Sequence, residues 1–294
     1  MPQNLELTLE RPMGKGETVI RNTRFEWGSR TYVMGIVNTT PDSFSGDGVV
    51  RNVETSVSQA LQFEAWGVDI VDVGGESTRP PGYYAGSEPV SSEEESARVV
   101  PVITALASAL RVPISVDTSK AEVARRAVAA GASMINDVWG LRRDPEMGSV
   151  AVETGVPVVL MHNQDGTEYD DLVPDVIGGL RGLLQGALDA GIPEGKIVLD
   201  PGIGFGKTAE QSLEVLRRLD EFRSLGRPIL TGTSRKSSIG KVLDVPVDDR
   251  IEGTAATVAL SIASGADIVR VHDVREMVRV ARMSDAIVRG WSEQ

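Results

Sequence analysis

The chain has 294 residues, with 42 acidic side chains against 30 Lys and Arg, so its formal net charge is −12. This acidic balance argues against a nucleic-acid partner and against a role at a membrane surface. The sequence contains no cysteine, which excludes disulfides, thiolate metal sites and a cysteine nucleophile. No stretch reaches the ~18 consecutive apolar residues of a membrane span, and the N-terminus lacks the apolar core of a secretory signal. We therefore expect a cytoplasmic protein.

Residues 1–17 are polar, with Pro12, Gly14 and Gly16 among them, and are expected to be a mobile lead-in to one domain over residues 18–294. The next stretch, 18–33, alternates around Gly28-Ser29. It predicts a β-hairpin that turns at this pair and plugs the bottom of the domain.

Eight short runs rich in Val and Ile follow, each nearly apolar throughout, as is typical of strands covered on both faces. Each of them is followed by a plausible helical segment. Eight β–α units predict an α/β fold, a single closed (β/α)₈ TIM barrel. The alternative, an open doubly wound sheet, usually has a Gly-rich turn after its first strand, which is missing here. The expected strands are 32–38, 69–75, 113–118, 133–139, 156–162, 196–202, 228–234 and 267–272. The helices expected between them include 53–66, 91–110, 120–130, 175–190, 209–222, 250–264 and 274–291.

Polar or charged residues stand at the C-terminal end of all eight predicted strands. Such groups are costly inside Val/Ile strands unless they are satisfied, and in a barrel this end is where active sites are built. The sequence therefore predicts a polar site there. The residues concerned are Asn38, Glu76 to Arg79, Asp117 to Lys120, Asn136, Asp137, His162, Asp200, Ser234 to Ser237, Arg270 and His272.

Several of these residues also have a purely structural interpretation. Asp72 and Asp137 are equally well explained as buried acceptors for neighbouring backbone amides. Asp117 could cap the helix that follows it, although the presence of Asn136 and Asp200 at the same strand ends favours a role in the site. His162 is better explained as a structural residue than as a base. With only two histidines, a zinc site is discounted.

The Gly-rich run from residue 200 to 208 resembles a phosphate loop, but it is one residue too short between Gly202 and the Gly-Lys pair for a Walker A motif. An ATPase assignment is not supported. The run is expected to let the backbone approach a ligand while presenting Phe205 and Lys207.

Arg270 and His272 point to the same face of one strand because side chains alternate with period two. With Lys236 on the neighbouring strand they predict an anion pocket beyond strands 7 and 8, where barrel enzymes often bind phosphate. The alternative is that they merely pair with Asp267 or Asp273.

Asp117, Asn136 and Asp200 come from strands 3, 4 and 6, so they can converge from different sides of a cleft. Two carboxylates and an amide accept from several N–H groups, and Lys236 donates to a carbonyl or ring nitrogen. This combination suits a flat, amino-substituted, oxo-bearing heterocycle. Paired carboxylates could also serve a glycosidase, but that chemistry needs no anion pocket.

Seven motifs resemble those of the dihydropteroate synthase family and occur in the family's order, and the resemblance runs from about residue 18 to 290. They are Met34–Ser45, Asp72–Pro80, Asp117–Lys120, Ile135–Asp137, Leu199–Lys207, Ser234–Ser237 and Arg270–Asp273. The resemblance implies an enzyme of folate synthesis, and a target of sulfonamides, that joins p-aminobenzoate to 6-hydroxymethyl-dihydropterin diphosphate and releases pyrophosphate. It also implies Mg²⁺ as cofactor and a homodimer formed through the last helices.

The resemblance further implies a role for individual residues. The pterin would be held by Asp117, Asn136, Asp200 and Lys236, with Val138, Met161 and Phe205 as apolar walls. The diphosphate would be held by Asn38, Thr78, Arg270 and His272, with Asn38 also a Mg²⁺ ligand. The p-aminobenzoate would be held by Thr78, Arg79, Pro80, Phe205 and Ser237. Asp117, Lys236, Arg270 and His272 are the expected catalytic residues.

The chain departs from the family pattern twice. Asp47 stands one position away from the usual acid, and the loop after Pro80 is longer and carries Tyr83 and Tyr84, which are expected to lie on the surface. Two other functions stay open: a methyltetrahydrofolate-dependent methyltransferase, which needs no diphosphate site, and a non-catalytic pterin-binding homologue.

Overall fold

The computed structural model describes residues 15–39, 48–76 and 90–291. Within them the eight predicted strands are all present, each inside or equal to its predicted range. They are β3 (Tyr32–Asn38), β4 (Ile70–Gly74), β5 (Ile114–Asp117), β6 (Met134–Asp137), β7 (Val158–Met161), β8 (Ile197–Asp200), β9 (Leu230–Thr231) and β10 (Ile268–Val271).

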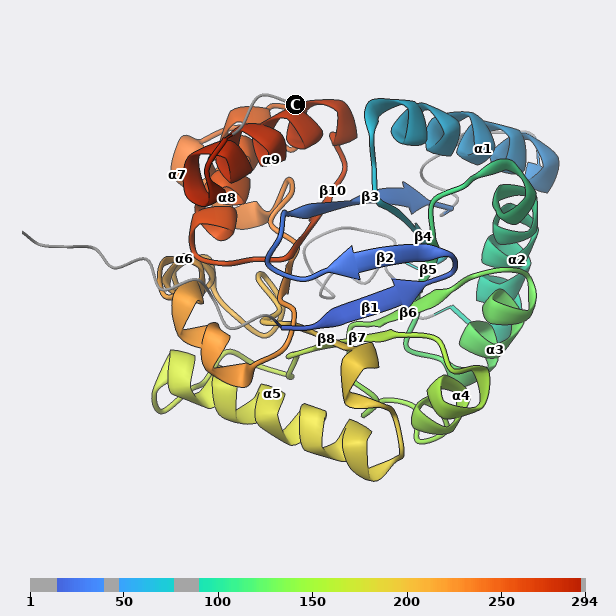
Figure 1. Cartoon of the computed structure of the whole chain (residues 1–294), viewed down its shortest axis with the longest axis horizontal. Helices are drawn as coiled ribbons and strands as arrows, with labels where there is room; N and C mark the ends of the chain where they lie inside the picture. The colour runs from blue at the N-terminus through green and yellow to red at the C-terminus, as the bar shows by residue number, and fades with distance from the viewer. Residues whose placement is uncertain (1–14, 40–47, 77–89, 292–294) are drawn as a thin grey trace, which may run out of the picture.

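These strands form one parallel sheet in the order β8-β7-β6-β5-β4-β3-β10-β9. A parallel bridge between Leu199 of β8 and Ile229, next to β9, joins the two edges. The sheet therefore closes on itself, with helices around it (Figure 1), and the predicted (β/α)₈ barrel is confirmed.

The helices surround the sheet and connect successive strands. Their bounds are α1 (Gly48–Trp66), α2 (Ser92–Ala109), α3 (Ala121–Ala129), α4 (Met147–Thr154), α5 (Leu172–Asp189), α6 (Ala209–Arg217), α7 (Ser237–Leu243), α8 (Ile251–Ala263) and α9 (Val274–Arg289), with 3₁₀ turns η2 (Glu194–Lys196) and η3 (Leu219–Leu225).

The helix predicted over 209–222 was wrong at its end, because α6 stops at Arg217 and the chain continues as η3. The residues that η3 buries, Leu219, Phe222 and Leu225, recur every third position. This spacing matches the three residues per turn of a 3₁₀ helix, so the tighter helix buries all three on one side.

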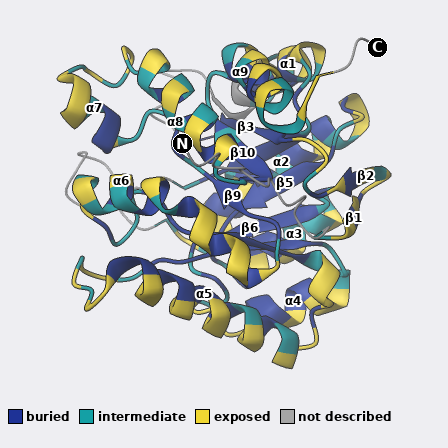
Figure 2. Cartoon of the chain, turned by 60° about the vertical axis from the view of Figure 1, so that its left-hand side comes forward, coloured by how far each residue is buried: buried dark blue, intermediate teal, exposed yellow. Residues whose placement is uncertain are grey.

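Strand side chains alternate between two apolar environments. Residues such as Val33, Val71 and Ile135 point outward and pack against the helices. Their neighbours Met34 and Ile70 point inward and fill the barrel. Figure 2 shows the result: the strands are buried, while the helices expose their outer faces.

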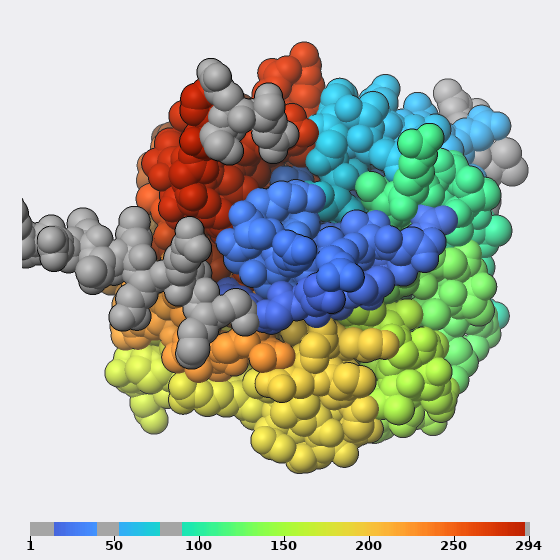
Figure 3. All heavy atoms as spheres, in the orientation of Figure 1, coloured from blue at the N-terminus to red at the C-terminus, as the bar shows by residue number. Residues whose placement is uncertain are grey.

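A β-hairpin closes one end of the barrel, as predicted. Its strands are β1 (Glu17–Ile20) and β2 (Thr23–Glu26), and Ile20 and Phe25 pack against the inward-facing residues of the barrel strands. Figure 3 shows the hairpin lying across this end of the molecule.

The predicted position of the hairpin turn was wrong. Because Ile20 pairs with Thr23, the turn consists of Arg21 and Asn22, with Arg21 in the left-handed region at φ 54°. Gly28 and Ser29 instead form the turn that leads into β3. Lys15, in the predicted lead-in, donates to Asp267 at 2.5 Å.

Among the described residues, no helix is both long and apolar enough to span a bilayer.

Candidate functional site

A layer of polar side chains lies above the apolar interior, at the barrel end opposite the hairpin. Asp72, Asp117 and Asn136 stand on the adjacent strands β4, β5 and β6, and Asp117 is the register partner of Asn136. Asp72 and Asn136 each stand two residues after an inward-facing side chain, Ile70 and Met134, and Asp117 is in register with Asn136. Because side chains alternate along a strand, all three point toward the barrel interior. Asp200 on β8 and Arg270 on β10 complete the layer from the other side of the barrel.

Arg270 joins the residues of this layer. Its Nε donates to Asp72 Oδ2 at 2.6 Å and its Nη2 donates to Asp117 Oδ2 at 2.7 Å. Asn136 Nδ2 donates to the same Asp72 oxygen at 3.1 Å. The strands that carry these residues are far apart in sequence, and their side chains nevertheless form one connected cluster, which we call the Arg270 cluster (Asp72, Asp117, Asn136 and Arg270).

This arrangement decides two alternatives that the sequence left open. Asp117 does not cap α3, whose first amide, that of Ala121, is bound by Asp144 Oδ2 at 2.8 Å. Arg270 pairs with neither Asp267 nor Asp273, because Asp273 is held by Arg235.

Asp72 and Asp137 prove to be different in role. Asp137 accepts from the amides of Trp139 and Leu141 at 2.9 and 2.7 Å and is the structural acceptor that one interpretation predicted. Asp72 belongs to the Arg270 cluster and was not among the predicted site residues. The sequence did hold a signal for Asp72: it is a carboxylate in the middle of an apolar strand, two residues after Ile70, so its side chain points into the barrel.

Asp200 lies near three cations. Its Oδ1 accepts from the Gly202 amide at 2.7 Å, and Lys236, Lys207 and Arg270 all act on its charge. Burial outweighs these cations and raises the pKa of Asp200 to about 6. Burial also raises the pKa of Asp117 to about 7, and it outweighs Arg270, which lowers this pKa, while the nearby negative charge of Asp72 raises it further. Both carboxylates therefore titrate close to neutrality.

Lys236 lies over the face of Phe205, with its Nζ 4.0 Å from the ring centroid. A cation over an aromatic face is a favourable contact, and it brings together the two residues predicted to hold one ring from different sides. Val138 and Met161, the other predicted apolar walls, are buried at the ends of β6 and β7.

The backbone of the Gly-rich run after β8 packs closely against the backbone of the loop after β7. Gly202 has φ +71°, and a Cβ built on it would lie 2.0 Å from the carbonyl oxygen of His162. Only glycine fits such a position. Lys207 Nζ is buried and donates to the carbonyl oxygens of Gly202 and Phe205 at 3.2 and 3.1 Å. Lys207 therefore stabilises the conformation of the Gly-rich run through hydrogen bonds to its own backbone.

His162 is a structural residue in this arrangement, in line with the preferred interpretation. Its Nδ1 lies 3.2 Å from Lys207 Nζ, and burial together with that cation lowers the pKa of His162 to about 3. It is therefore neutral at physiological pH.

The predicted anion pocket adjoins the Arg270 cluster. His272 Nδ1 lies 3.0 Å from Ser234 Oγ, which also accepts from the His272 amide at 3.1 Å. Arg250 stabilises the loop after β9, because it donates to the carbonyl oxygen of Arg235 at 2.9 Å. Ser237 follows as the first residue of α7. The loop thus begins at Ser234, which contacts His272, and goes on to Lys236 and Ser237.

Asn38 ends β3 and faces the same spot as Asp117. A Cβ built on Gly74 would lie 3.8 Å from Asp117 Oδ2 and 3.9 Å from Asn38 Oδ1. Within the described ranges no group of three His, Cys, Asp or Glu could hold a metal ion. An amide oxygen fits Mg²⁺, which is commonly bound by one or two protein oxygens with waters and substrate phosphates. Asn38 is thus suited to a metal that arrives with a phosphate ligand.

Lys120 forms a further ion network beside the site. Its Nζ lies 2.5 Å from both Glu76 Oε2 and Glu95 Oε2, and Glu95 is fully buried. Thr78, Arg79 and Pro80 lie outside the described residues, as do Asp47, Tyr83 and Tyr84, so their predicted roles stay predictions.

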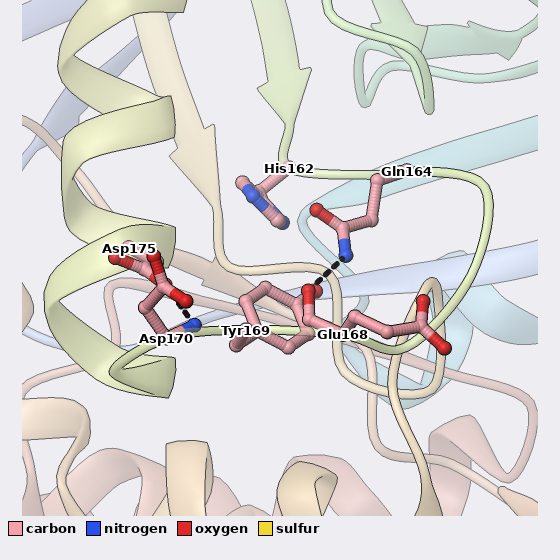
Figure 4. Close-up of a pocket in the computed structure, with 6 residues that line it drawn as sticks. All are labelled: His162, Gln164, Glu168, Tyr169, Asp170 and Asp175. Atoms are coloured by element: carbon pink, nitrogen blue, oxygen red, sulfur yellow. Dashed lines mark hydrogen bonds between the residues drawn. The ribbon is translucent and has the colours of Figure 1, made fainter.

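A separate hollow of about 280 Å³ lies between the loop after β7 and α5 (Figure 4). It is lined by His162, Gln164, Glu168, Tyr169, Asp170 and Asp175. Its three carboxylates would repel an anionic ligand, and no member of the Arg270 cluster lines it. The candidate site is therefore the polar layer inside the barrel mouth.

The fold and this layer agree with a family comparison. The profile of pterin binding enzymes matches residues 34–272. The dihydropteroate synthase of Clostridium beijerinckii is 51% identical over 271 residues, covering 92% of this chain and 99% of that protein.

Solved structures agree as well. The Clostridium difficile dihydropteroate synthase in the presence of pteroic acid is 52% identical, with a TM-score of 0.86, over 90% of this chain and 99% of that one. The Xanthomonas albilineans enzyme with 4-aminobenzoic acid is 41% identical, also with a TM-score of 0.86, over 92% and 97% of the two chains. The chain therefore belongs to the dihydropteroate synthase family of pterin binding enzymes.

Proposed function

We propose that this protein is a dihydropteroate synthase. It condenses 6-hydroxymethyl-7,8-dihydropterin diphosphate with p-aminobenzoate to 7,8-dihydropteroate and pyrophosphate, in folate biosynthesis. The observation that carries the proposal is the union of acceptors and cations in one layer: Asp117 and Asn136 connected to Arg270, with Asp200 and Lys236 beside them. Membership of the family gives this layer its ligand.

The pterin is held by the acceptors of the layer. Asp117, Asn136 and Asp200 accept from the amino group and ring N–H groups, while Lys236 donates to the carbonyl oxygen or a ring nitrogen. Phe205 lies under Lys236 and forms one apolar wall. Val138 and Met161 form the others. A buried polar site of this kind discriminates against rings that leave its groups unpaired.

Cleavage of the bond between the pterin methylene and the diphosphate separates charge, and the site carries groups that stabilise both the negative and the positive charge. Negative charge grows on the departing pyrophosphate, where Arg270 and His272 donate to it. Positive charge grows on the methylene conjugated with the pterin ring, where Asp117 and Asp200 stabilise it. The arylamine of p-aminobenzoate is a free nucleophile at neutral pH, so its attack needs no strong general base.

Mg²⁺ belongs to this proposal as a cofactor held by Asn38, and when bound it supplies counter-charge to the diphosphate. The oxygen of Asn38 faces the same spot as Asp117, which supports this placement. Thr78 completes the diphosphate contacts on the strength of the family resemblance.

The second substrate site lies over Ser237 and Phe205, closed by Thr78, Arg79 and Pro80. A sulfonamide, which mimics p-aminobenzoate, should compete for it and bind most tightly once pyrophosphate and the pterin are in place. The same proposal places the enzyme in the cytoplasm.

We also propose that the protein acts as a homodimer through its last helices. Leu260 on α8 and Met283 and Ile287 on α9 are 60%, 62% and 72% exposed, and α8 packs directly against α9. Large exposed apolar side chains on neighbouring helices support an interface.

Pyrophosphate release tests the proposed function. Purified protein with both substrates and Mg²⁺ should release pyrophosphate and form 7,8-dihydropteroate, and omitting p-aminobenzoate should abolish the dihydropteroate. Binding of methyltetrahydrofolate without pyrophosphate release would instead indicate the methyltransferase. Pterin binding with no turnover would indicate a non-catalytic homologue.

A further inference from the structure

Asp72 is buried beneath the residues proposed to touch the pterin. It is fully buried in the middle of β4. Its Oδ2 accepts from Arg270 Nε at 2.6 Å and from Asn136 Nδ2 at 3.1 Å. Its Oδ1, also buried, accepts no hydrogen bond within the described part of the chain. Among the described residues, every hydrogen bond that this carboxylate makes therefore goes to the side chain of another member of the Arg270 cluster.

The contact with Asp72 determines the orientation of the Asn136 amide. An amide has a donor end and an acceptor end of nearly the same shape, so packing alone distinguishes them poorly. An ionised carboxylate can only accept. Nδ2 of Asn136 must therefore face Asp72, which leaves Oδ1 as the end that accepts from a ligand.

The same carboxylate also orients Arg270. The guanidinium is held at two corners, Nε by Asp72 and Nη2 by Asp117. Two attachments fix the plane of this flat group. The Nη1 end is left to point at an anion.

We propose that Asp72 is a positioning residue: it fixes the acceptor end of Asn136 toward the pterin and holds the Arg270 guanidinium in the plane in which it meets the leaving group. The inference rests on the proposed function, since it assigns a task to a residue beneath that site. It differs from a charge-balancing role, in which Asp72 would only neutralise Arg270 and the amide of Asn136 would be free to turn.

Two substitutions of Asp72 separate the two roles. Asp72→Leu removes the acceptor, so the amide of Asn136 is free to turn and Arg270 loses one of its two attachments. Asp72→Asn can keep an oxygen where Oδ2 accepts from both partners, so it removes the charge and retains the orientation. A positioning role therefore predicts that Asp72→Asn retains much of the pterin affinity that Asp72→Leu loses, whereas a charge-balancing role predicts equal losses.

The measurement is calorimetric affinity for 6-hydroxymethyl-7,8-dihydropterin without diphosphate, at pH 8, with the melting temperature alongside. We expect Asp72→Leu to weaken binding by 10-fold or more, about 1.4 kcal/mol, and Asp72→Asn to recover at least half of that loss in free energy. The KM for p-aminobenzoate should change less than twofold. Asp267→Asn is the matched control, because Asp267 is an equally buried aspartate at the opposite end of the barrel that holds Lys15 and the Ile229 amide. It should lower the melting temperature and leave pterin affinity within twofold.

Wild-type affinity for Asp72→Leu, or an Asp72→Asn variant that binds no better than Asp72→Leu, would overturn the inference. If Asp72→Leu does not fold, Asp72→Asn is compared with the wild type alone, and a loss of 10-fold or more would then overturn the inference. Failure of the wild-type protein to bind the pterin or to release pyrophosphate would refute the proposed function instead, and it would be seen before any variant is measured.

Discussion

Replacing Arg270 by methionine should destabilise the fold strongly at pH 8. Arg270 compensates Asp72 and Asp117, which are 0% and 4% exposed, through bonds of 2.6 and 2.7 Å. Removing one partner of a buried ion pair typically costs about 3–5 kcal/mol, because an uncompensated charge remains in a medium that solvates it poorly. Two carboxylates lose their partner here, so we expect a loss in the upper part of that range, about 4–5 kcal/mol.

The loss should shrink as the pH falls. Burial already raises the pKa of Asp117 to about 7 while Arg270 opposes the shift, so removing Arg270 raises this pKa further. An acid whose folded-state pKa lies above its unfolded-state value of about 3.9 binds protons preferentially when folded. Its penalty is complete above the folded-state pKa and disappears as the pH falls toward the unfolded-state value. The variant should therefore recover part of its deficit at pH 5.5.

Urea unfolding followed by tryptophan fluorescence at pH 8 and 5.5 would measure both effects. Arg126→Met is the matched control: Arg126 also bridges two acids, Glu93 and Glu122, but all three side chains are exposed. Exposed pairs contribute at most about 1 kcal/mol. If the Arg270 variant lost no more than this control, or if its deficit grew toward pH 5.5, the reasoning from buried charge would be refuted.

Three further predictions concern positions around the site. Gly202→Ala should cost about 3 kcal/mol or more in urea unfolding, because a Cβ there combines a positive φ with a backbone clash; Gly178→Ala, in a helix with nothing within 4 Å, should gain about 0.5–1 kcal/mol, and equal effects would contradict the geometry. Lys120→Met should cost about 3–5 kcal/mol by leaving a buried glutamate unpaired, far more than Arg126→Met, and a loss below 1 kcal/mol would show that the network is not buried in solution. Pterin affinity should fall as the pH drops below about 6, since protonation removes the negative charge of Asp200 and turns one of its two acceptor oxygens into a donor; calorimetry showing undiminished binding at pH 5 would remove Asp200 from the contact.

Local patterns in the sequence were enough to predict the strands. Each barrel strand is buried on both faces, so most of its residues are apolar, and nothing distant is needed to recognise such a run. The hairpin was predicted for the same reason, but its turn was not. Alternation is compatible with several registers, and the packing of Ile20 and Phe25 into the barrel selected the turn at Arg21 and Asn22.

The sequence by itself also determined that polar groups gather at one end of the barrel, because side-chain parity and strand direction are local properties. Only the tertiary structure decided which of those groups meet. Arg270 finds its partners 198 and 153 residues away. Asp72 and Asp137 are alike in local sequence context, but Asp72 points into the barrel and Asp137 points to the outer side of its strand. Closure of the sheet sets these contacts, and a buried charge takes whichever partner the closed barrel brings within reach.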